Sequence, residues 1–533
     1  MNYLKMIRAE FKGYSLRTLK MDLLAGITVA AVALPLALAF GVSNGVDAAA
    51  GMITAIIAGG VIGSLSGSFY QISGPTGAMG AILISIVATK GFAGVMLATF
   101  LAGVFLLLAG ILKIGSITSL IPAPVITGFT SGIAIIIALG QLDNFFGVHS
   151  EGHNLIEKLQ SYQQFGFSPN AATTLLGLCV IIGMIVFPKK WNQKIPASLV
   201  MIILATILTV LLKLPIATVG KIPTTLISDN RLFFSDLQLS GLKDVIIPAI
   251  SIAMLGMIES LLCGASAGRM TGKELDSNQE LIAQGIGNII LPFFGGVPAT
   301  AAIARTSVAI KSGAQTRLTG IFHAVFLLLS MMVFAPIMSN IPMSALAGVL
   351  IVTAWRMNEW EIIQEFCKKR FYPALIKFFV TMIATVIFDL SLAIILGVAA
   401  SCLIFLAKSS QISINVEEID WERMSMAPVE HTKDWVVVYL SGPLFFMSSG
   451  KLKRSLDDLK DKEGIILSMR GVSSIDTTAL TILSDCYAQR KKTGQELHFS
   501  SMQPEVKEMI KTMHIDPEVS YHFSVADALR ELY

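Results

Sequence analysis

Two charged residues lie inside apolar stretches of the chain, where a charged side chain could bind an ion or carry a proton. Glu259 lies deep in the apolar stretch 250–262, and Arg305 lies in the middle of a second stretch, 300–310. A charge inside an apolar segment that lies in a membrane is costly, so a functional role is the first hypothesis. Arg305 could supply positive potential to an anion, or it could pair structurally or reach an aqueous face. Glu259 could carry a proton, form an ion pair with Arg305 or another partner, or coordinate a cation.

Two apolar segments are too short to cross a bilayer, and each follows a proline. The sequence Tyr70-Gln-Ile-Ser-Gly-Pro75 indicates extended chain, and the segment after it, 76–89, is only about 21 Å long as a helix. Gly295-Gly-Val-Pro298 similarly precedes a segment that reaches about Lys311. The N-terminus of a helix offers free N–H groups and a positive partial charge, which together favour an anion. We therefore expect an anion site where the two short helices begin.

Small residues surround the two expected helix starts. They are Gly77, Ala78, Ala301 and Ala302. They would allow a ligand to approach the backbone closely, while Thr76 adds a hydroxyl group and Arg305 lies about one turn inside the second helix. The alternative is that these residues only permit tight helix packing. That alternative does not explain why both short helices follow a proline at matched positions.

The composition predicts that these segments lie in a membrane. Of the 533 residues, 54% are hydrophobic and only 14% are charged, against about 25% charged in an ordinary soluble protein. Apolar stretches of membrane length recur, and shorter ones broken by Gly and Pro lie between them. The predicted segments are 23–41, 49–65, 76–89, 92–112, 123–142, 171–187, 197–212, 245–263, 281–294, 300–310, 318–338, 343–355, 372–388 and 391–407. The first of them lacks the short apolar region and cleavage pattern of a signal peptide.

The distribution of basic residues supports fourteen crossings. With the N-terminus inside, 18 lysines and arginines fall on the cytoplasmic side and 6 on the outer side, leaving out Arg305 within a segment. Basic residues are enriched in cytoplasmic loops. We therefore expect a multi-pass protein of the inner (plasma) membrane with both termini in the cytoplasm.

Landmarks in the two halves of this region repeat at a nearly constant offset. Pro75 matches Pro298 at an offset of 223, and Asp22 matches Asp244 at 222. The pair Ile121-Pro122 matches Ile341-Pro342 at an offset of 220. Each half has an odd number of crossings, so the second half must insert upside down. The expected fold is a polytopic α-helical membrane protein with a seven-plus-seven inverted repeat and two half-helices.

The last quarter of the chain has the composition of a soluble domain. Residues 1–408 carry 26 basic and 17 acidic side chains, a net charge of +9, whereas the remaining residues carry 14 and 19, a net charge of −5. Segments 435–440, 464–468 and 497–500 have the pattern of buried strands, and 449–460, 477–493 and 504–513 that of helices. We expect a cytoplasmic N-terminus (1–21), a transmembrane domain (22–408), a linker (409–429) and a small α/β domain (430–533).

Several function classes are disfavoured. The chain has neither a phosphate-binding loop of the Walker type nor a Gly-rich motif between a strand and a helix, so we expect neither an enzyme nor an ATP-driven pump. The five cysteines are scattered without metal-ligand spacing, which indicates packed free thiols and no bound metal or cofactor. A nucleic-acid binder would carry a dense basic patch on a soluble domain.

Several sequence stretches resemble the SulP anion transporters, the sulfate permease family of solute carriers. They are Asp22-Leu-Leu-Ala-Gly-Ile-Thr-Val-Ala, Ile72-Ser-Gly-Pro-Thr-Gly, Gln284-Gly-Ile-Gly-Asn288 and Arg305-Thr-Ser-Val. The last quarter, with Leu440-Ser-Gly-Pro-Leu-Phe-Phe and Ser473-Ser-Ile-Asp-Thr-Thr-Ala-Leu480, resembles a STAS domain. The resemblance covers nearly the whole chain.

This resemblance implies a core domain (segments 1–4 and 8–11) that carries the anion past a gate domain (5–7 and 12–14) in an elevator-like movement of a homodimer. The anion would lie between the third and tenth segments. The residues implied in binding it are Thr76, Gly77, Ala78, Ala302, Ile303, Ala304 and Arg305.

Two positions depart from the family members that resemble sodium-coupled bicarbonate carriers. Those members have an aspartate where this chain has Glu259 and a threonine where it has Cys263. The departures favour proton coupling over sodium coupling. In the STAS domain, Thr477 stands where related antagonists carry a phosphorylatable serine, but a helix-capping role for Asp476 or Thr477 is the better interpretation.

We therefore expect a secondary active transporter of a small anion, such as sulfate, bicarbonate or a dicarboxylate, coupled to protons through Glu259. The alternatives are a nucleobase–cation symporter of the same fold, sodium-coupled bicarbonate uptake, a regulatory receptor and an anion channel. Arg305 argues against the nucleobase symporter, and a channel needs no coupling carboxylate. The expected partners are the anion, a proton or sodium ion, membrane lipid, a second copy of the chain and a cytoplasmic partner of the STAS domain.

Overall fold

The chain folds into two compact units, Met1–Val398 and Ala399–Tyr533. Each unit has a hydrophobic core of its own. The computed structural model describes residues 3–116, 121–151, 155–188, 191, 195–220, 222, 224–237, 239–388, 390–419, 421, 434–512 and 520–531.

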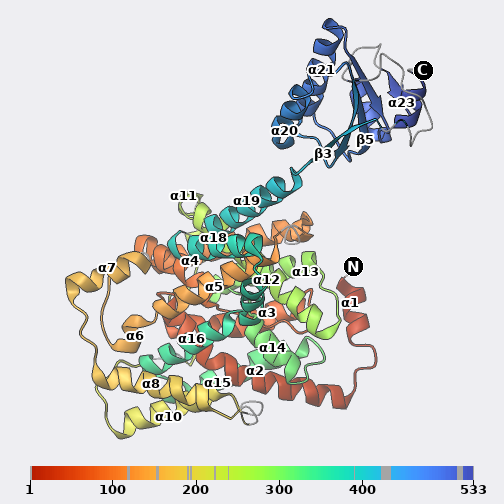
Figure 1. Cartoon of the computed structure of the whole chain (residues 1–533). Helices are drawn as coiled ribbons and strands as arrows, with labels where there is room; N and C mark the ends of the chain where they lie inside the picture. The colour runs from red at the N-terminus through yellow and green to blue at the C-terminus, as the bar shows by residue number, and fades with distance from the viewer. Residues whose placement is uncertain are drawn as a thin grey trace. The chain divides into compact units, whose positions relative to one another are not determined.

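The first unit is almost entirely helical (Figure 1). Its helices are α1 (Tyr3–Glu10), α2 (Leu16–Ser43), α3 (Ala48–Leu65), α4 (Gly80–Ile111), α5 (Ala123–Leu139), α6 (Leu142–Phe146), α7 (Leu155–Phe165), α8 (Ala171–Val186), α10 (Ala197–Leu211), α11 (Leu239–Asp244), α12 (Ile246–Thr271), α13 (Ser277–Ile290), α14 (Ile303–Lys311), α15 (Leu318–Met338), α16 (Met343–Met357), α17 (Trp360–Lys368), α18 (Tyr372–Ile387) and the first part of α19 (Leu390–Ser409), which continues into the second unit. Short 3₁₀ helices are η1 (Gly77–Met79), η3 (Phe234–Asp236) and η4 (Leu291–Phe294). A two-residue strand lies in each half of the unit, β1 (Ser73–Gly74) and β2 (Thr300–Ala301).

Seven helices in the described part of the chain are long and apolar enough to cross a bilayer. They are Leu16–Ser43, Ala48–Leu65, Ile82–Ile111, Ala123–Phe146, Ile246–Thr271, Leu318–Met338 and Leu392–Ser409. Four further apolar helices are shorter: Ala171–Val186, Ala197–Leu211, Met343–Met357 and Tyr372–Ile387. The helical membrane fold is confirmed, whereas the count of fourteen crossings stays a prediction.

A single glycine divides α4 at the point where two segments were predicted to meet. Gly91 has φ 66° and ψ −170°, a backbone conformation that residues with a side chain rarely adopt. The helical path therefore bends there and separates Gly80–Lys90, which begins at the candidate site, from the following portion. The short helix predicted over 76–89 is thus the first part of a kinked helix.

Helix packing in the first unit falls into two sets. In one set α4 packs on α12 and α13, and α15 packs on α2 and α3. In the other set α18 packs on α5, and α16 packs on α5 and α8. Close approach is possible in the second set because Gly128 of α5 has no side chain: a Cβ there would lie 2.4 Å from the carbonyl oxygen of Phe378. The sets meet where α16 and α10 pack on α2 and where α5 packs on η1.

The second unit contains a five-stranded mixed sheet with strand order β3-β4-β5-β6-β7. The strands are β3 (Ser413–Glu418), β4 (Trp435–Ser441), β5 (Gly464–Gly471), β6 (Glu496–Ser500) and β7 (Tyr521–His522), and the helices are α20 (Phe446–Asp457), α21 (Thr477–Lys492), α22 (Pro504–Thr512) and α23 (Val525–Glu531). β3 pairs antiparallel with β4, and the other neighbouring strands are parallel. The three strands predicted from the sequence are confirmed.

Asp476 holds the starts of α20 and α21 together. Its carboxylate accepts hydrogen bonds from the backbone N–H of Ala479, at 2.8 Å, and of Phe446, also at 2.8 Å. The first bond is an N-terminal cap of α21. The capping interpretation of this position is therefore confirmed for Asp476.

Two histidines form a buried chain on neighbouring strands of this sheet. Nδ1 of His498 lies 2.9 Å from Nε2 of His522, and Nε2 of His498 lies 2.8 Å from the carboxylate of Glu496. At the other end, Nδ1 of His522 lies 3.3 Å from the carboxylate of Glu531. Burial lowers the pKa of His522, and the Glu531 carboxylate only partly opposes this shift.

Lowering the pH should loosen this edge of the sheet. Because the folded state holds the pKa of His522 below its ordinary value, the unfolded state binds a proton more readily, and stability falls as the pH drops through that value. Hydrogen–deuterium exchange of the full chain, corrected for intrinsic rates, should show several-fold less protection of β6, β7 and α23 at about pH 5.5 than at about pH 7.5. A His522→Gln variant should lose most of this difference. Equal pH dependence in the variant would assign the effect to other groups.

Candidate functional site

The two short extended segments next to Pro75 and Pro298 lie side by side. β1 and β2 pair antiparallel, with Ser73 opposite Ala301 and Gly74 opposite Thr300. The pairing continues one step further, because the N–H of Ala302 donates to the carbonyl of Ile72 at 3.0 Å. The pair therefore fixes the starts of η1 and α14 next to each other, although their residues are more than 200 positions apart in the chain.

Polar side chains of α12 and α13 hold the β1–β2 pair in place. Gln284 donates to the hydroxyl of Ser73 at 2.9 Å, and the hydroxyl groups of Ser260 and Thr300 lie 2.9 Å apart. Asn288 forms two bonds with the backbone of Ala299, accepting from its N–H at 2.8 Å and donating to its carbonyl at 3.0 Å. These buried hydrogen bonds hold the strand pair as a rigid platform.

The helices that start from this platform have uncapped N-termini. Thr76 precedes η1 and Ala302 precedes α14, and within the described residues neither start receives a side-chain capping bond. Thr76, Gly77 and Ala78 are buried, whereas Ile303 and Ala304 are exposed. The structure thus brings together the predicted residues of both segments, with free N–H groups on the first turn of α14.

Arg305 is buried and reaches across from one half to the other. Only 1% of its surface is exposed, and its Nη2 donates to the carbonyl of Pro75 at 2.8 Å. Its Nη1 is buried with no hydrogen-bond partner in the described structure. A side chain at Gly74 would exclude this arrangement, since a Cβ there would lie 2.5 Å from Nη1. An unpaired guanidinium N–H beside two helix N-termini is suited to an anion.

Glu259 extends from α12 towards the other short helix. Its carboxylate accepts one hydrogen bond, from the hydroxyl of Thr76 at 3.2 Å. Among the ion pairs of the described residues, none joins Glu259 to Arg305. Most of the accepting capacity of this carboxylate therefore remains available to a proton or a cation.

A second carboxylate near the β1–β2 pair, Glu280 of α13, was missed by the sequence analysis, which singled out Glu259 alone as a carboxylate deep in an apolar helix. Glu280 is fully buried and accepts from Ser66 at 2.5 Å, from the N–H of Gly67 at 3.1 Å, from Gln71 at 3.0 Å and from Gln284 at 2.8 Å. Four donors leave little accepting capacity for an ion. The four-residue spacing of Glu280, Gln284 and Asn288 places them on one face of α13 and could have indicated this row of polar side chains.

Cys263 lies one turn beyond Glu259 and belongs to the same polar region. Its Sγ lies 3.2 Å from the hydroxyl of Thr306, which also accepts from the N–H of Ile72 at 3.0 Å. The thiol is buried, as expected for a packed free cysteine. Within the described residues no group of three or more His, Cys, Asp or Glu side chains is arranged to hold a metal ion.

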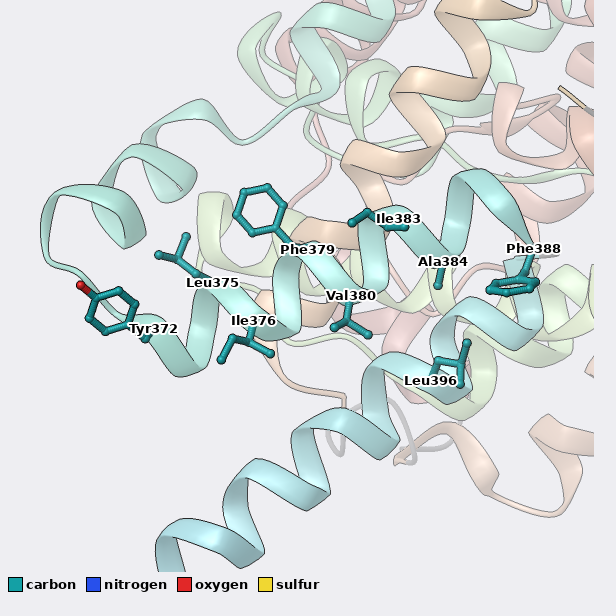
Figure 2. Close-up of a pocket in the computed structure, with 9 residues that line it drawn as sticks. All are labelled: Tyr372, Leu375, Ile376, Phe379, Val380, Ile383, Ala384, Phe388 and Leu396. Atoms are coloured by element: carbon teal, nitrogen blue, oxygen red, sulfur yellow. The ribbon is translucent and has the colours of Figure 1, made fainter. Parts of the chain in front are cut away.

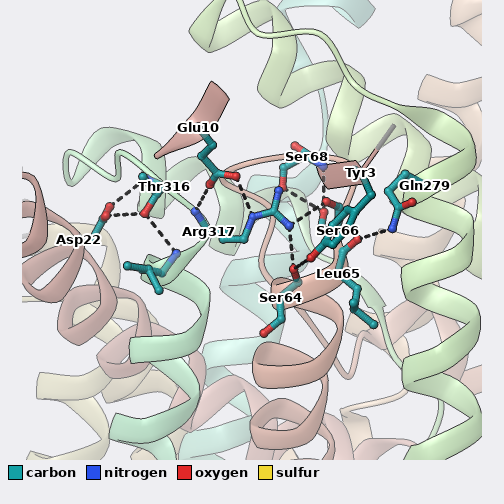
Figure 3. Close-up of polar contacts among 12 residues, drawn as sticks. Tyr3, Glu10, Asp22, Ser64, Leu65, Ser66, Ser68, Gln279, Thr316 and Arg317 are labelled. Carbon is teal, nitrogen blue, oxygen red and sulfur yellow. Dashed lines mark hydrogen bonds and ion pairs between the residues drawn. The ribbon is translucent and has the colours of Figure 1, made fainter. Parts of the chain in front are cut away.

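A network of hydrogen bonds joins the N-terminal segment to the loop after α14 (Figure 3). Asp22 accepts from the N–H groups of Gln315 and Thr316, at 2.7 and 3.0 Å, and from the hydroxyl groups of Thr316 and Thr319, at 2.6 and 2.9 Å. Tyr14 also donates to it at 3.1 Å. Burial, and then the charge of Asp22, raise the pKa of Tyr14 to about 12, so the phenol remains a donor at neutral pH.

Arg317, at the start of α15, extends this network to Glu10 of α1. Its backbone N–H and its Nε donate to the two carboxylate oxygens of Glu10, at 2.6 and 2.7 Å, and its Nη1 donates to the carbonyl of Ser64 at 2.7 Å. Burial raises the pKa of Glu10, and Arg317 partly offsets this effect. The network thereby fixes the end of the loop that joins α14 to α15 (Figure 3).

Replacing Asp22 by asparagine should destabilise the protein strongly. Asparagine offers one acceptor oxygen in place of two, so at least two of the five donors would lose their partner, at a cost of about 2–4 kcal/mol. Thermal unfolding of the full chain in detergent should show a lower midpoint. Asp47→Asn is the matched control: Asp47 caps α3 with a single bond to Ala50, and asparagine caps a helix equally well. Equal midpoints for Asp22→Asn and wild type would rule out this role.

Comparison with known proteins identifies the chain. The model of the sulfate permease family matches residues 19–384, and the STAS domain model matches residues 426–528. The chain belongs to the sulfate permease family. It is therefore a multi-pass membrane transport protein with a C-terminal STAS domain, as the sequence motifs predicted.

Members of the sulfate permease family resemble the chain over most of its length. The Bacillus subtilis protein named "Putative sulfate transporter YvdB" is 34% identical over 515 residues, which cover 94% of this chain and 95% of that protein. The bicarbonate transporter BicA of Picosynechococcus is 29% identical over 493 residues, covering 88% and 86%. The solved transmembrane domain of a cyanobacterium BicA is 30% identical, with a TM-score of 0.65, and covers 73% of this chain and 98% of its own.

Proposed function

We propose that this sulfate permease family member takes up a small inorganic anion, sulfate or bicarbonate, by secondary active transport. One observation carries the proposal: the β1–β2 pair brings two uncapped helix starts together, beside an unpaired, buried N–H of Arg305. Thr76, Gly77, Ala78, Ala302, Ile303 and Ala304 would form the remaining walls. Backbone N–H groups and one guanidinium suit an anionic substrate better than an uncharged nucleobase. The names of the relatives, sulfate and bicarbonate transporters, agree with this chemistry.

The proposed coupling ion is a proton carried by Glu259. This carboxylate accepts a single hydrogen bond, from Thr76, whose own backbone lies at the start of η1. Protonation of Glu259 would remove a negative charge next to the incoming anion and so favour its binding. After release of the proton on the other side, the carboxylate would repel the anion. Anion and proton would therefore move together.

The proposed movement is of the elevator type. The set formed by α2, α3, α4, α12, α13, α14 and α15, together with η1 and the β1–β2 pair and the residues next to them, carries every proposed binding residue. It would move as one body against the set formed by α5, α8, α10, α16 and α18. The dense hydrogen bonding around β1, β2 and α13 supports rigid-body motion of the first set. We further propose a homodimer in the inner membrane with both termini in the cytoplasm and a STAS domain that binds a cytoplasmic partner.

Uptake into proteoliposomes tests the proposal. Labelled sulfate, bicarbonate and a dicarboxylate are offered with an inward proton gradient, with an inward sodium gradient, and with neither. We expect one of the first two anions to accumulate only with the proton gradient. Accumulation driven by sodium and insensitive to pH would overturn the proton assignment, and accumulation of none of the anions would overturn the transport proposal.

Sodium-coupled bicarbonate uptake is the second candidate function. It is favoured by the hydroxyl groups of Ser260, Thr300 and Thr306 next to the β1–β2 pair, because oxygen atoms are the ligands that hard cations prefer. The thiol of Cys263 at this place is a poor ligand for such a cation. The sodium arm of the uptake experiment decides between the two candidates.

A further inference from the structure

An apolar groove runs along α18, and none of the proposed anion-binding residues lines it (Figure 2). It has a volume of about 520 Å³ and is lined by side chains of α18 between Tyr372 and Phe388 and by Leu396 of α19. The hydroxyl of Tyr372, at one end of the groove, is the only polar side-chain group of this lining (Figure 2). In a transmembrane helix such a hollow faces hydrocarbon, so its natural occupant is an acyl chain.

The helix before the groove has the character of an interfacial helix. α17 has no buried residue, and its apolar side chains include Ile363 and Phe366. Trp360 at its start packs on Trp355, with ring centroids 4.5 Å apart, and donates to the Trp355 carbonyl at 3.0 Å. Tryptophans and short amphipathic helices of this kind lie at the boundary between hydrocarbon and head groups.

Basic residues lie at the end of α17 and in the turn that leads to α18. Lys368, Lys369 and Arg370 are all exposed, and the N–H of Tyr372 donates to the carbonyl of Arg370 at 2.8 Å, which keeps the turn close to the groove. Lys369 forms an ion pair with Glu365, and an exposed ion pair of this kind contributes little to the stability of the fold. This loop is on the cytoplasmic side in the predicted topology, where the leaflet carries anionic lipids.

We propose that the groove and this basic turn together bind one anionic phospholipid, with an acyl chain along α18 and the phosphate at Lys368 and Arg370. Charge complementarity selects the occupant: an acyl chain satisfies the groove, and only an anionic head group also satisfies the exposed basic side chains at its mouth. A second copy of the chain would cover the apolar surface without neutralising these charges.

The position of this lipid gives it influence over transport. α18 packs on α5, where Gly128 lies against the backbone of Phe378, and α5 in turn packs on η1 at the candidate site. A Cβ at Gly77 would lie 2.5 Å from a side-chain carbon of Ile137 of α5, so these surfaces touch closely. A lipid that orders α18 would therefore also stabilise α5, the helix against which η1 would move. The lipid site does not depend on which anion is carried.

Native mass spectrometry of the full chain, incubated with phosphatidylglycerol or phosphatidylcholine of the same chain length, tests the proposal. Wild type should retain phosphatidylglycerol preferentially. Lys368→Gln/Arg370→Gln should reduce retained phosphatidylglycerol about tenfold, because each basic residue near an anionic head group contributes to binding. Lys12→Gln/Arg17→Gln, which removes two exposed charges elsewhere, should retain as much as wild type.

A second pair of variants tests the groove itself. Val380→Trp fills the groove and should reduce retention of both lipids, whereas Ile387→Trp changes an exposed residue of α18 outside the lining and should not. Equal retention of the two lipids by wild type, or an equal loss in both charge variants, would overturn the proposal. So would a Val380→Trp protein that changes from dimer to monomer yet retains phosphatidylglycerol, since a second copy would then be the occupant.

Discussion

Replacing Arg305 by alanine should raise the KM for the transported anion by about tenfold to a hundredfold, since a hydrogen bond to a charged group contributes about 1.5–3 kcal/mol. The substitution removes the Arg305 guanidinium from the two helix starts and also the bond to the carbonyl of Pro75. The expected loss is one of binding, because free N–H groups of α14 remain. Uptake rates of labelled anion into proteoliposomes, measured over a range of anion concentrations, give the KM directly.

Arg305→Lys is the informative companion variant. Lysine keeps the positive charge, but its ammonium group is a point charge. It cannot reproduce the planar guanidinium group of Arg305, in which Nη2 donates to the carbonyl of Pro75 while Nη1 remains without a partner among the described residues. We expect an intermediate KM, between those of wild type and alanine. Thermal unfolding in detergent must show that both variants remain folded. An unchanged KM in a folded Arg305→Ala protein would remove this residue from the anion site.

Replacing Glu259 by glutamine should abolish accumulation driven by a proton gradient while anion exchange persists. An inward gradient of about one pH unit supplies about 1.4 kcal/mol per proton, enough for about tenfold accumulation of an anion that enters with one proton. Glutamine is uncharged and cannot release a proton, so this driving force should be lost. Counterflow of labelled against unlabelled anion needs no net proton movement and should continue.

Glu280→Gln is the matched control for this prediction. Glu280 is a buried carboxylate of the neighbouring helix α13, and its oxygens already accept from Ser66, Gly67, Gln71 and Gln284. Its substitution should lower the thermal midpoint and leave the coupling of the folded fraction intact. If Glu259→Gln still accumulates anion with the proton gradient, or if Glu280→Gln uncouples and Glu259→Gln does not, the coupling residue has been assigned to the wrong helix.

The sequence alone predicted the features that depend on local pattern. The prolines at Pro75 and Pro298 and the short segments after them indicated two helix starts, and the structure places those starts together. The near-continuous apolar runs in the second unit predicted β4, β5 and β6, because parallel strands are buried on both faces.

Features that depend on tertiary contacts were not predicted. The β1–β2 pairing joins residues more than 200 positions apart, and two-residue strands carry no periodic signal. Glu280 was missed because its burial depends on donors from α3 and the chain after it. α17 was missed because the search for membrane segments does not detect a short helix with polar residues on one face. α20 begins three residues before its predicted start, where Asp476 from another element holds Phe446.

The central claim is that the anion lies between the starts of η1 and α14, against Arg305. Cryo-electron microscopy of the full chain, with and without the anion that proves to be transported, tests it most directly. We predict added density within hydrogen-bond distance of the first N–H groups of α14 and of Nη1 of Arg305. Added density elsewhere in the transmembrane domain, with this place unchanged, would contradict the account.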